Sequence, residues 1–481
     1  MKVTVAVLDK HGDNVVDEVV DVLVELCDWR PSHFGLVSPI KSVSEKNPDI
    51  LKRQSLISST LVGYVSSRPA SASGYEFLQL DDAALAFEGR VYSPIPKTTV
   101  TEEVAKEPHQ CEVLLQKLMQ NADGDYAFFL LRDGWVGTGR DPVGVQPLFY
   151  GENQSIVALA SNRRALWKLG IEKPLSFPPG NMAFVNREGF QFKPLKTLSF
   201  REPEQTTLDD SAKRLRFLLE ESIKRRIRRV KKVAVAFSGG LDSSLVAFLA
   251  SKLGVKVTLL HVSMENQAET EEAIAASEAL NLTLQVHLFK DSDVENTLPK
   301  VMALIEEADP VKASVGLPFY WAAEKASESN FEVMLAGQGA DELFGGYQRY
   351  VAEYCQGGSE RVLKTMFGDV TRIHESNLER DLKITSCFDV ELRLPFASFD
   401  LAEFALALPI ECKIVPEPDT LRKLVLRKAA LDAGLPVSMS SKPKRAVQYS
   451  TGINNAIKRV AKKHGKTVNQ YLTGLLEASK N

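Results

Sequence analysis

The stretch Val233–Ser244, with the sequence VAVAFSGGLDSS, constrains the fold of this chain more than any other. Its first five residues are apolar and include the β-branched Val233 and Val235, as in a buried strand, and Gly239-Gly240 separates them from a helical pattern that begins at Asp242. A glycine turn at this position presents backbone N–H groups and the positive end of the helix to one point, which favours a phosphate group. Because Asp242 would repel a bare phosphate, the sequence predicts a Mg²⁺ ion between them.

After this stretch, segments of strand character alternate with segments of helical character. Strands are predicted at Val255–Val262, Thr283–Phe289 and Phe331–Ala336, and helices at Thr270–Leu280, Thr297–Glu307 and Phe319–Ser327. Such alternation predicts a parallel sheet with helices on its faces and with ligands at the carboxyl ends of the strands. The glycine-rich turns that follow Phe237 and Ala336 would then meet at the same edge of the sheet.

The second glycine-rich turn, Ala336–Tyr347, has the sequence AGQGADELFGGY. Four glycines and the adjacent carboxylates Asp341 and Glu342 are more than an ordinary loop requires. If the two turns converge, Asp242 and Asp341 can hold one Mg²⁺ ion on a pyrophosphate group, with one carboxylate from each turn.

The first part of the chain has a different pattern. Lys2–Leu8 predicts a strand and Val15–Cys27 a helix. Short β-type runs follow between Glu76 and Tyr150, with one helix predicted at Cys111–Gln120, and this combination favours an α+β sandwich. The stretch Leu166–Thr207 is rich in Pro, Gly and aromatic residues, which is typical of a boundary between domains.

Composition excludes several classes of protein. A net charge of −3 over 481 residues gives no electrostatic reason to expect a nucleic-acid or membrane partner. Five cysteines without a CxxC pair favour reduced thiols in the cytoplasm. No apolar run approaches the ~20 residues of a membrane helix, and the N-terminus is too polar for a signal peptide. The basic end of a helix predicted at Asp209–Arg229 is better explained by the helix dipole than by a nucleic-acid patch.

Several motifs resemble one known family. SGGLDSS resembles the pyrophosphate loop of enzymes that cleave ATP between the α- and β-phosphates and form an acyl-adenylate. Gly124–Phe128, Gly139–Tyr150 and Ala160–Asn162 resemble consecutive landmarks of the class II glutamine amidotransferase domain, and Pro178–Gly180 resembles the turn that closes it. In this order, the motifs make the chain similar to the asparagine synthetases over nearly its full length.

The resemblance implies two domains and a reaction. An α+β N-terminal nucleophile-type sandwich is expected over residues 1–200, and an α/β parallel-sheet PP-loop domain, similar to the adenine nucleotide alpha hydrolases, over residues 209–481. The second domain would use ATP and Mg²⁺ to form an acyl-adenylate from a carboxylate such as aspartate, and ammonia or an amine would displace AMP. A homodimer in the cytoplasm is the candidate assembly.

The first domain departs from the family where glutamine would be hydrolysed. The family has a cysteine directly after the initiator Met, whose free α-amine acts as base on its own thiol. Here that position is Lys2, and the first cysteine, Cys27, falls in a predicted helix. The family's Asn-Gly-Glu oxyanion-hole string is Glu88-Gly89-Arg90, and an ionised Glu88 has no hydrogen to donate. Gln110 stands where an Asp holds the substrate's amino group, so glutaminase activity is predicted to be absent.

The resemblance assigns the nucleotide-binding residues of the second domain. Pyrophosphate would be bound by Ser238, Gly239, Gly240, Ser243 and Ser244, the nucleotide would lie along the backbones of Phe237, Val262, Ala336 and Gly337, and Asp242 and Asp341 would hold Mg²⁺.

Three further residues are candidates for catalysis. The segment 442–452 resembles the family's KEQFSDG segment, whose lysine faces the phosphates; strict alignment puts Ala446 there, with Lys444 and Arg445 just before it. The alternative is a solvated basic loop. Lys312 stands near the position of a family arginine that clamps the aspartate carboxylate, and it can bind a carboxylate as a point charge. The alternative there is an ordinary passage from helix to loop.

Gln338 stands where the glutamine-dependent enzymes have a Glu thought to assist ammonia attack as a base, and an amide cannot take a proton.

The main interpretation of the sequence is an ammonia-dependent asparagine synthetase-like ligase. Two alternatives stay open. One is an adenylating ligase for another carboxylate, similar to the β-lactam-forming synthetases, which also depart from Glu at this position. The other is a non-catalytic nucleotide-binding protein of the same family.

Overall fold

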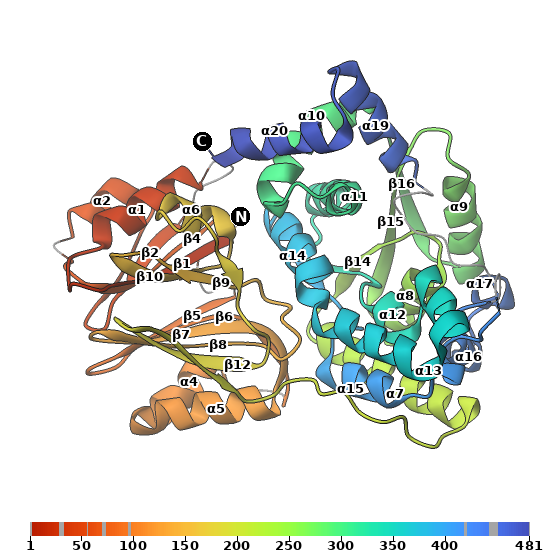
Figure 1. Cartoon of the computed structure of the whole chain (residues 1–481), viewed down its shortest axis with the longest axis horizontal. Coiled ribbons are helices and arrows are strands. Elements are labelled where there is room, and N and C mark those ends of the chain that lie inside the picture. Colours follow the sequence, from red (N-terminus) through yellow and green to blue (C-terminus); the bar gives the residue numbers. More distant parts are fainter. Residues whose placement is uncertain are drawn as a thin grey trace. The chain divides into compact units, whose positions relative to one another are not determined.

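The computed structural model describes residues 2–27, 33–54, 56–69, 74–94, 98–417, 421–441 and 451–480. The chain divides into two compact units, Met1–Thr197 and Leu198–Asn481 (Figure 1). In the described ranges, no helix is both long enough and apolar enough to cross a membrane.

The first unit contains two antiparallel sheets. One has the order β11-β9-β10-β1-β4-β2-β3, from strands β1 Lys2–Asp9, β2 His33–Val37, β3 Ser42–Glu45, β4 Thr60–Ser66, β9 Phe149–Glu152, β10 Ile156–Ala160 and β11 Leu175–Ser176. The other has the order β13-β12-β8-β7-β6-β5, from β5 Tyr75–Gln79, β6 Ala84–Ser93, β7 Asp123–Arg132, β8 Trp135–Arg140, β12 Asn181–Asn186 and β13 Gly189–Pro194.

The alternation of side chains along β1 explains how these layers pack. Val5 and Val7 point to the helix side of their sheet and pack in one cluster with Val16 of α1 (Val16–Glu25). Leu8 points to the opposite face and shares a core with Phe129 of the second sheet. The other helices of this unit are α2 Pro48–Lys52, α4 Val100–Lys106, η1 Pro108–Gln110, α5 Cys111–Asn121 and α6 Arg163–Lys168. Two helix layers therefore enclose two stacked sheets (Figure 1).

The second unit has the predicted parallel sheet. Its order is β16-β15-β14-β17-β18, with β14 Lys232–Ala236, β15 Lys256–Met264, β16 Thr283–Phe289, β17 Val333–Leu335 and β18 Glu391–Arg393, and every adjacent pair is parallel. The helices are α7 Leu208–Arg226, α8 Leu241–Lys252, α9 Ala268–Leu280, α10 Asp291–Ile305, α11 Pro310–Glu328, α12 Ala340–Phe344, α13 Gln348–Thr371, η2 His374–Leu378, α14 Glu379–Ser386, α15 Phe399–Ala407, η3 Ile410–Cys412, α16 Leu424–Ala433, α17 Val437–Ser440, α19 Ile453–Lys463 and α20 Val468–Lys480.

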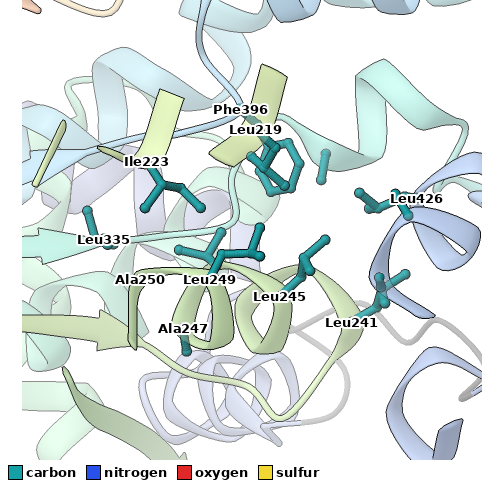
Figure 2. Close-up of a cluster of buried hydrophobic side chains, with 14 of the residues drawn as sticks. Leu219, Ile223, Leu241, Leu245, Ala247, Leu249, Ala250, Leu335, Phe396 and Leu426 are labelled. Carbon is teal, nitrogen blue, oxygen red and sulfur yellow. The ribbon is translucent and has the colours of Figure 1, made fainter. Parts of the chain in front are cut away.

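A buried cluster fixes α8 between the sheet and its neighbouring helices. Leu245 and Leu249 of α8 lie in one cluster with Leu219 of α7, Leu335 of β17 and Leu426 of α16 (Figure 2). Burying side chains of this size stabilises the unit by roughly 1.5–3 kcal/mol each. The first turn of α8 therefore has a fixed position at the carboxyl end of β14.

Some boundaries differ from the predicted ones. α11 begins at Pro310 rather than Phe319, because the Asp309 side chain accepts the N–H groups of Val311 and Lys312 and caps the helix. The prediction of a helix over Val15–Cys27 is too long at its end, since α1 ends at Glu25 and Cys27 lies outside it.

The last turn of α7 contains the cations Lys224, Arg225 and Arg226, as the helix dipole favours, and one of them is buried. The helix ends at Arg226, whose guanidinium is fully buried and donates to Ser222 Oγ at 2.8 Å and to the carbonyl of Ala397 at 3.2 Å. Arg226 thus serves internal packing, which neither the dipole nor a nucleic-acid patch would require.

Candidate functional site

The two glycine-rich turns are in direct contact, as the topology predicts. A Cβ atom placed on Gly337 would lie 2.9 Å from Cβ of Asp242 and 3.2 Å from the backbone nitrogen of Ser243. Only a glycine at position 337 lets the turn after β17 approach the start of α8 this closely. The carboxyl ends of β14 and β17 therefore form one edge, and both turns border it.

The first turn places two serine hydroxyls beside the N-terminus of α8. Gly239 has a φ of +69°, and Gly240 is the N-cap residue without a side-chain cap. The hydroxyl groups of Ser238 and Ser243 lie 3.3 Å apart beside it. An uncapped N-terminus next to two hydroxyl groups matches the predicted phosphate site.

A cavity of about 670 Å³ opens at this edge of the sheet. Of the predicted site residues, its wall contains Phe237, Ser238, Asp242, Ser243, Val262, Lys312, Ala336, Gly337 and Asp341. Gly239, Gly240 and Ser244 are not on the wall, and Ser244 is fully buried. The wall also contains residues that the sequence analysis did not select, including His261, Asp309, Arg349, Asp369, Asn377 and Arg380. The volume lies in the range of small-molecule and cofactor sites.

Lys423 is another residue of the site that the sequence analysis did not select. Its ammonium group lies 2.7 and 2.6 Å from the carboxylate oxygens of Asp242 and 2.7 Å from Oδ1 of Asp341, and the side chain is only 1% exposed. Gly346 leaves room for this arrangement, because a Cβ there would lie 1.8 Å from Oδ1 of Asp341 and 2.5 Å from Cε of Lys423. A cation thus joins the two carboxylates that were predicted to share Mg²⁺.

The same two carboxylates fit a Mg²⁺ ion whose other ligands come from phosphates and water, which is how proteins usually bind this ion. The described residues contain no group of three or more His, Cys, Asp or Glu side chains arranged to hold a metal by themselves. Asp242 and Asp341 could therefore hold Mg²⁺ together with a bound nucleotide, and the ion would then take the place that the ammonium group of Lys423 occupies between them.

His261 fixes the strand ends beside the nucleotide turn. Its Nδ1 lies 3.0 Å from the carbonyl oxygen of Phe237, and its Nε2 lies 3.2 Å from the hydroxyl of Thr270. Burial lowers the pKa of His261, so the neutral ring donates through Nδ1 and accepts through Nε2. The neutral imidazole thereby joins β15 to the turn that begins at Phe237.

The cavity wall also carries charged side chains that form ion pairs. Lys312 forms an ion pair with Glu307, so part of its charge is already engaged. Arg349 pairs with Asp369 at 2.6 Å, and both residues lie on the cavity wall. The wall therefore carries both signs of charge, as a zwitterionic amino acid would require of its binding site.

A set of hydrogen-bonded polar side chains lies beside Gln338. The Nε2 atom of Gln338 donates to Oδ2 of Asp381 at 2.6 Å. Arg380 donates to both oxygens of the same carboxylate, through Nε at 2.7 Å and Nη2 at 3.1 Å. Burial raises the pKa of Asp381, while the charge of Arg380 and both sets of hydrogen bonds lower it. On the same wall, burial and the neighbouring Asp341 charge raise the pKa of Glu342.

Lys444, Arg445 and Ala446 lie outside the described residues. Thr451 follows that segment and lies on the cavity wall, where its carbonyl accepts the N–H of Met264 at 3.1 Å.

In the first unit, a buried carboxylate, Glu88, lies at the position of the family's oxyanion-hole motif. Glu88 is 6% exposed, and its carboxylate accepts the hydroxyl of Thr4 at 2.7 Å. That hydroxyl also lies 2.8 Å from the phenol oxygen of Tyr75. Burial raises the pKa of Glu88, and the hydrogen bond from Thr4 and the charge of Lys2 lower it. Gln110 is exposed at the end of η1.

Comparison with known proteins identifies the family. The family model for asparagine synthase matches residues 214–364 and 355–479. A relative from Methanocaldococcus jannaschii, named as an asparagine synthetase (glutamine-hydrolyzing), is 34% identical over 407 residues, which cover 74% of this chain and 75% of that protein. Asparagine synthetases (glutamine-hydrolyzing) from Triphysaria versicolor and Asparagus officinalis are 25% and 28% identical over 68% and 71% of this chain, which spans 57% and 60% of their lengths. With half of the sequence matched by the model and a relative at 34% identity, the chain belongs to the asparagine synthase family.

Proposed function

We propose that the second unit is an ATP-dependent carbon–nitrogen ligase that forms an acyl-adenylate and releases AMP. The observation that carries the proposal is the contact of Gly337 with Asp242 and Ser243, because it brings two phosphate-type turns to the wall of one cavity. Membership of the asparagine synthase family supports the same reaction class.

In the first half-reaction, a carboxylate oxygen of the substrate attacks the α-phosphorus of ATP, and pyrophosphate leaves with the electrons of the broken P–O bond. The N–H groups at the start of α8 and the hydroxyls of Ser238 and Ser243 bind the pyrophosphate. Asp242 and Asp341 would hold Mg²⁺, which supplies positive charge to the phosphate oxygens. His261 keeps the strand ends in register, so the backbones of Phe237 and Val262 can bind the base and sugar.

In the second half-reaction, ammonia attacks the acyl carbon and the bond to AMP breaks. We propose aspartate as the carboxylate substrate, since the charged pairs on the cavity wall suit an α-amino acid. Lys312 would exchange its contact with Glu307 for the substrate carboxylate. Lys444 and Arg445 keep their proposed role of offsetting charge in the transition state.

We propose that free ammonia, not glutamine, is the nitrogen donor. Glu88 accepts hydrogen bonds where an oxyanion hole needs donors, and Lys2 occupies the first position after Met1. The first unit would then be structural. The altered residue Gln338 also favours a second candidate, a ligase of the same mechanism for a different carboxylate.

The test is the incorporation of labelled pyrophosphate into ATP, with aspartate and with a panel of other amino acids. Exchange with aspartate supports the main proposal, and exchange only with another acid supports the second candidate. The variant Asp242→Asn should reduce exchange by about 100-fold or more. The control Asp210→Asn, at an exposed position of α7, should leave exchange unchanged. A protein that binds ATP without any acid-dependent exchange would contradict both candidates.

A further inference from the structure

Asp242 and Asp341 meet at the ammonium group of Lys423. The ammonium nitrogen lies 2.7 and 2.6 Å from the two oxygens of Asp242 and 2.7 Å from Oδ1 of Asp341. An ammonium group has three hydrogens to donate, so these three oxygens can engage all of them. The same oxygens are the ones that the two carboxylates would offer to Mg²⁺. The lysine and the metal ion are therefore rivals for one set of ligands.

The chain holds Lys423 firmly at this place. Its side chain is only 1% exposed. On one side, the carbonyl of Arg422 accepts the Nε–H of Arg427 at 2.5 Å. On the other side, the N–H of Leu424 donates to the carbonyl of Lys413 at 2.9 Å. A tethered cation has a high effective concentration beside its partners, so a divalent ion from solution must compete with a group that is always nearby.

Two arginines add positive charge next to the lysine. Arg422 interacts electrostatically with Asp341, and Arg427 interacts with Asp242. Glu342, beside Asp341, is the third carboxylate of this group. The group thus has as many basic side chains as carboxylates, so a divalent ion that enters alone would add positive charge without compensation. An ion that arrives with a triphosphate brings its own negative charge.

We propose that Lys423 competes with Mg²⁺ for Asp242 and Asp341, so that the site accepts the ion only together with a nucleotide. The inference rests on the proposed function, because ATP is the ligand that would bring the ion, and it adds a control on that same site. Mg²⁺ is commonly bound by one or two carboxylates together with the phosphates of its substrate. Phosphate oxygens would complete the coordination of the ion, and Lys423 would exchange its carboxylate partners for phosphate oxygens.

This competition goes beyond a role of Lys423 as a link between the two turns. A purely structural cation predicts only a loss of stability when it is removed. A competitor predicts, in addition, that its removal creates a binding site for a free divalent ion. The two roles therefore differ in a quantity that can be measured without any turnover.

The test is a titration of full-length protein with Mn²⁺ alone, followed by the electron paramagnetic resonance signal of the free ion. Mn²⁺ takes the same oxygen ligands as Mg²⁺. The titrated proteins are the wild type, Lys423→Met, Lys423→Gln and a control, Lys428→Met. The amide of Lys423→Gln can still donate to a carboxylate, so this variant should disturb folding less than methionine does. Lys428 also belongs to α16, but it pairs with Asp209 and Asp432.

We expect both Lys423 variants to bind Mn²⁺ at least about 10-fold more tightly than the wild type, because a positive charge no longer opposes the ion. Lys428→Met should match the wild type. The double variant Lys423→Gln/Asp341→Asn should lose the gain, which would locate the ion. Mg²⁺ should also raise the urea midpoint of Lys423→Met more than that of the wild type, since the ion replaces the missing cation.

The wild type provides a second measurement that does not depend on how the variants fold. Calorimetry with a non-hydrolysable ATP analogue should give tighter binding with Mg²⁺ than without it. Equal affinity in the two conditions would overturn the inference. So would tight binding of Mn²⁺ alone to the wild type that disappears in Asp341→Asn, because the lysine would then not exclude the free ion.

Failure of this inference and failure of the proposed function give different results. Unchanged Mn²⁺ affinity in a folded Lys423 variant, with acid-dependent pyrophosphate exchange present in the wild type, would overturn the inference alone. A gain of Mn²⁺ binding in the Lys423 variants, with no exchange in the wild type, would support the competition and contradict the proposed ligase reaction.

Discussion

The ammonium nitrogen of Lys423 lies 2.6 Å from Oδ2 of Asp242, although 181 positions separate the two residues in the chain. The same nitrogen contacts Asp341, so one cation joins the first turn, the second turn and the start of α16. Lys423 has a φ of +61°, a backbone conformation that residues other than glycine rarely adopt. The surrounding contacts thus hold this lysine in place at a cost in backbone strain.

Replacing Lys423 should destabilise the second unit. Lys423→Met leaves two carboxylates facing one another without their cation, and breaking a buried ion pair in this way typically costs about 3–5 kcal/mol. Lys428→Met, on the same helix but with a partly exposed side chain, should destabilise the unit far less, because solvent screens its ion pair with Asp432. Urea unfolding of both variants measures the difference. Equal effects would show that Lys423 does not hold the turns together.

Gly337→Ala should separate the two turns. Its new Cβ would lie 2.9 Å from Cβ of Asp242, so either the turn after β17 or the start of α8 must move. A shift of this kind at a phosphate site should weaken ATP binding by about 10-fold or more. Calorimetry with ATP and Mg²⁺ measures the loss.

Gly474→Ala is the matched control, because this glycine lies in α20, where the nearest atom to a new Cβ is 3.6 Å away. It should leave ATP affinity unchanged. Normal ATP affinity in Gly337→Ala would contradict the close approach of the two turns as a requirement for nucleotide binding.

The parallel sheet and the convergence of its turns could be predicted from the sequence, because both depend on local patterns and on a general rule of topology. Val233–Phe237 is apolar, the glycines follow at once, and the carboxyl ends of parallel strands share one edge. The start of α11 could not be predicted correctly from the sequence. Its apolar pattern before Phe319 is weak, and the capping by Asp309 fixes the true start.

The partners of the site residues could not be predicted. Lys423 lies in an unremarkable basic stretch, and only the packing of α16 against α7 and α8 brings it to Asp242. Asp381 gives no local signal either, since its partner Gln338 is 43 residues away. Long-range pairs of this kind depend on tertiary packing, whereas a motif records only neighbours along the chain.

Burial of His261 should make stability depend on pH. The pKa of this histidine is lowered in the folded chain, so between its folded and unfolded values only the unfolded chain binds the proton. Stability should therefore fall as the pH drops below about 6.5, the ordinary value for histidine. Thermal unfolding between pH 5 and 8 measures the trend.

His261→Asn isolates this contribution. The amide can still donate to the Phe237 carbonyl, but it does not titrate, so the difference in stability between variant and wild type should shrink as the pH falls. The lowered pKa of His287 acts in the same direction and remains in both proteins. A difference that is constant across this pH range would contradict the role assigned to His261.

Restoring a cysteine after the initiator Met should not restore glutamine hydrolysis. In Lys2→Cys the thiol and the α-amine would both be available once Met1 is removed, yet Glu88 would still present a hydrogen-bond acceptor where the developing oxyanion needs donors. Release of glutamate from glutamine should stay at the background rate, while pyrophosphate exchange by the second unit continues. Exchange serves as the control for folding. Glutamate release well above background in this variant, with exchange intact, would contradict the proposal that Glu88 blocks glutamine hydrolysis.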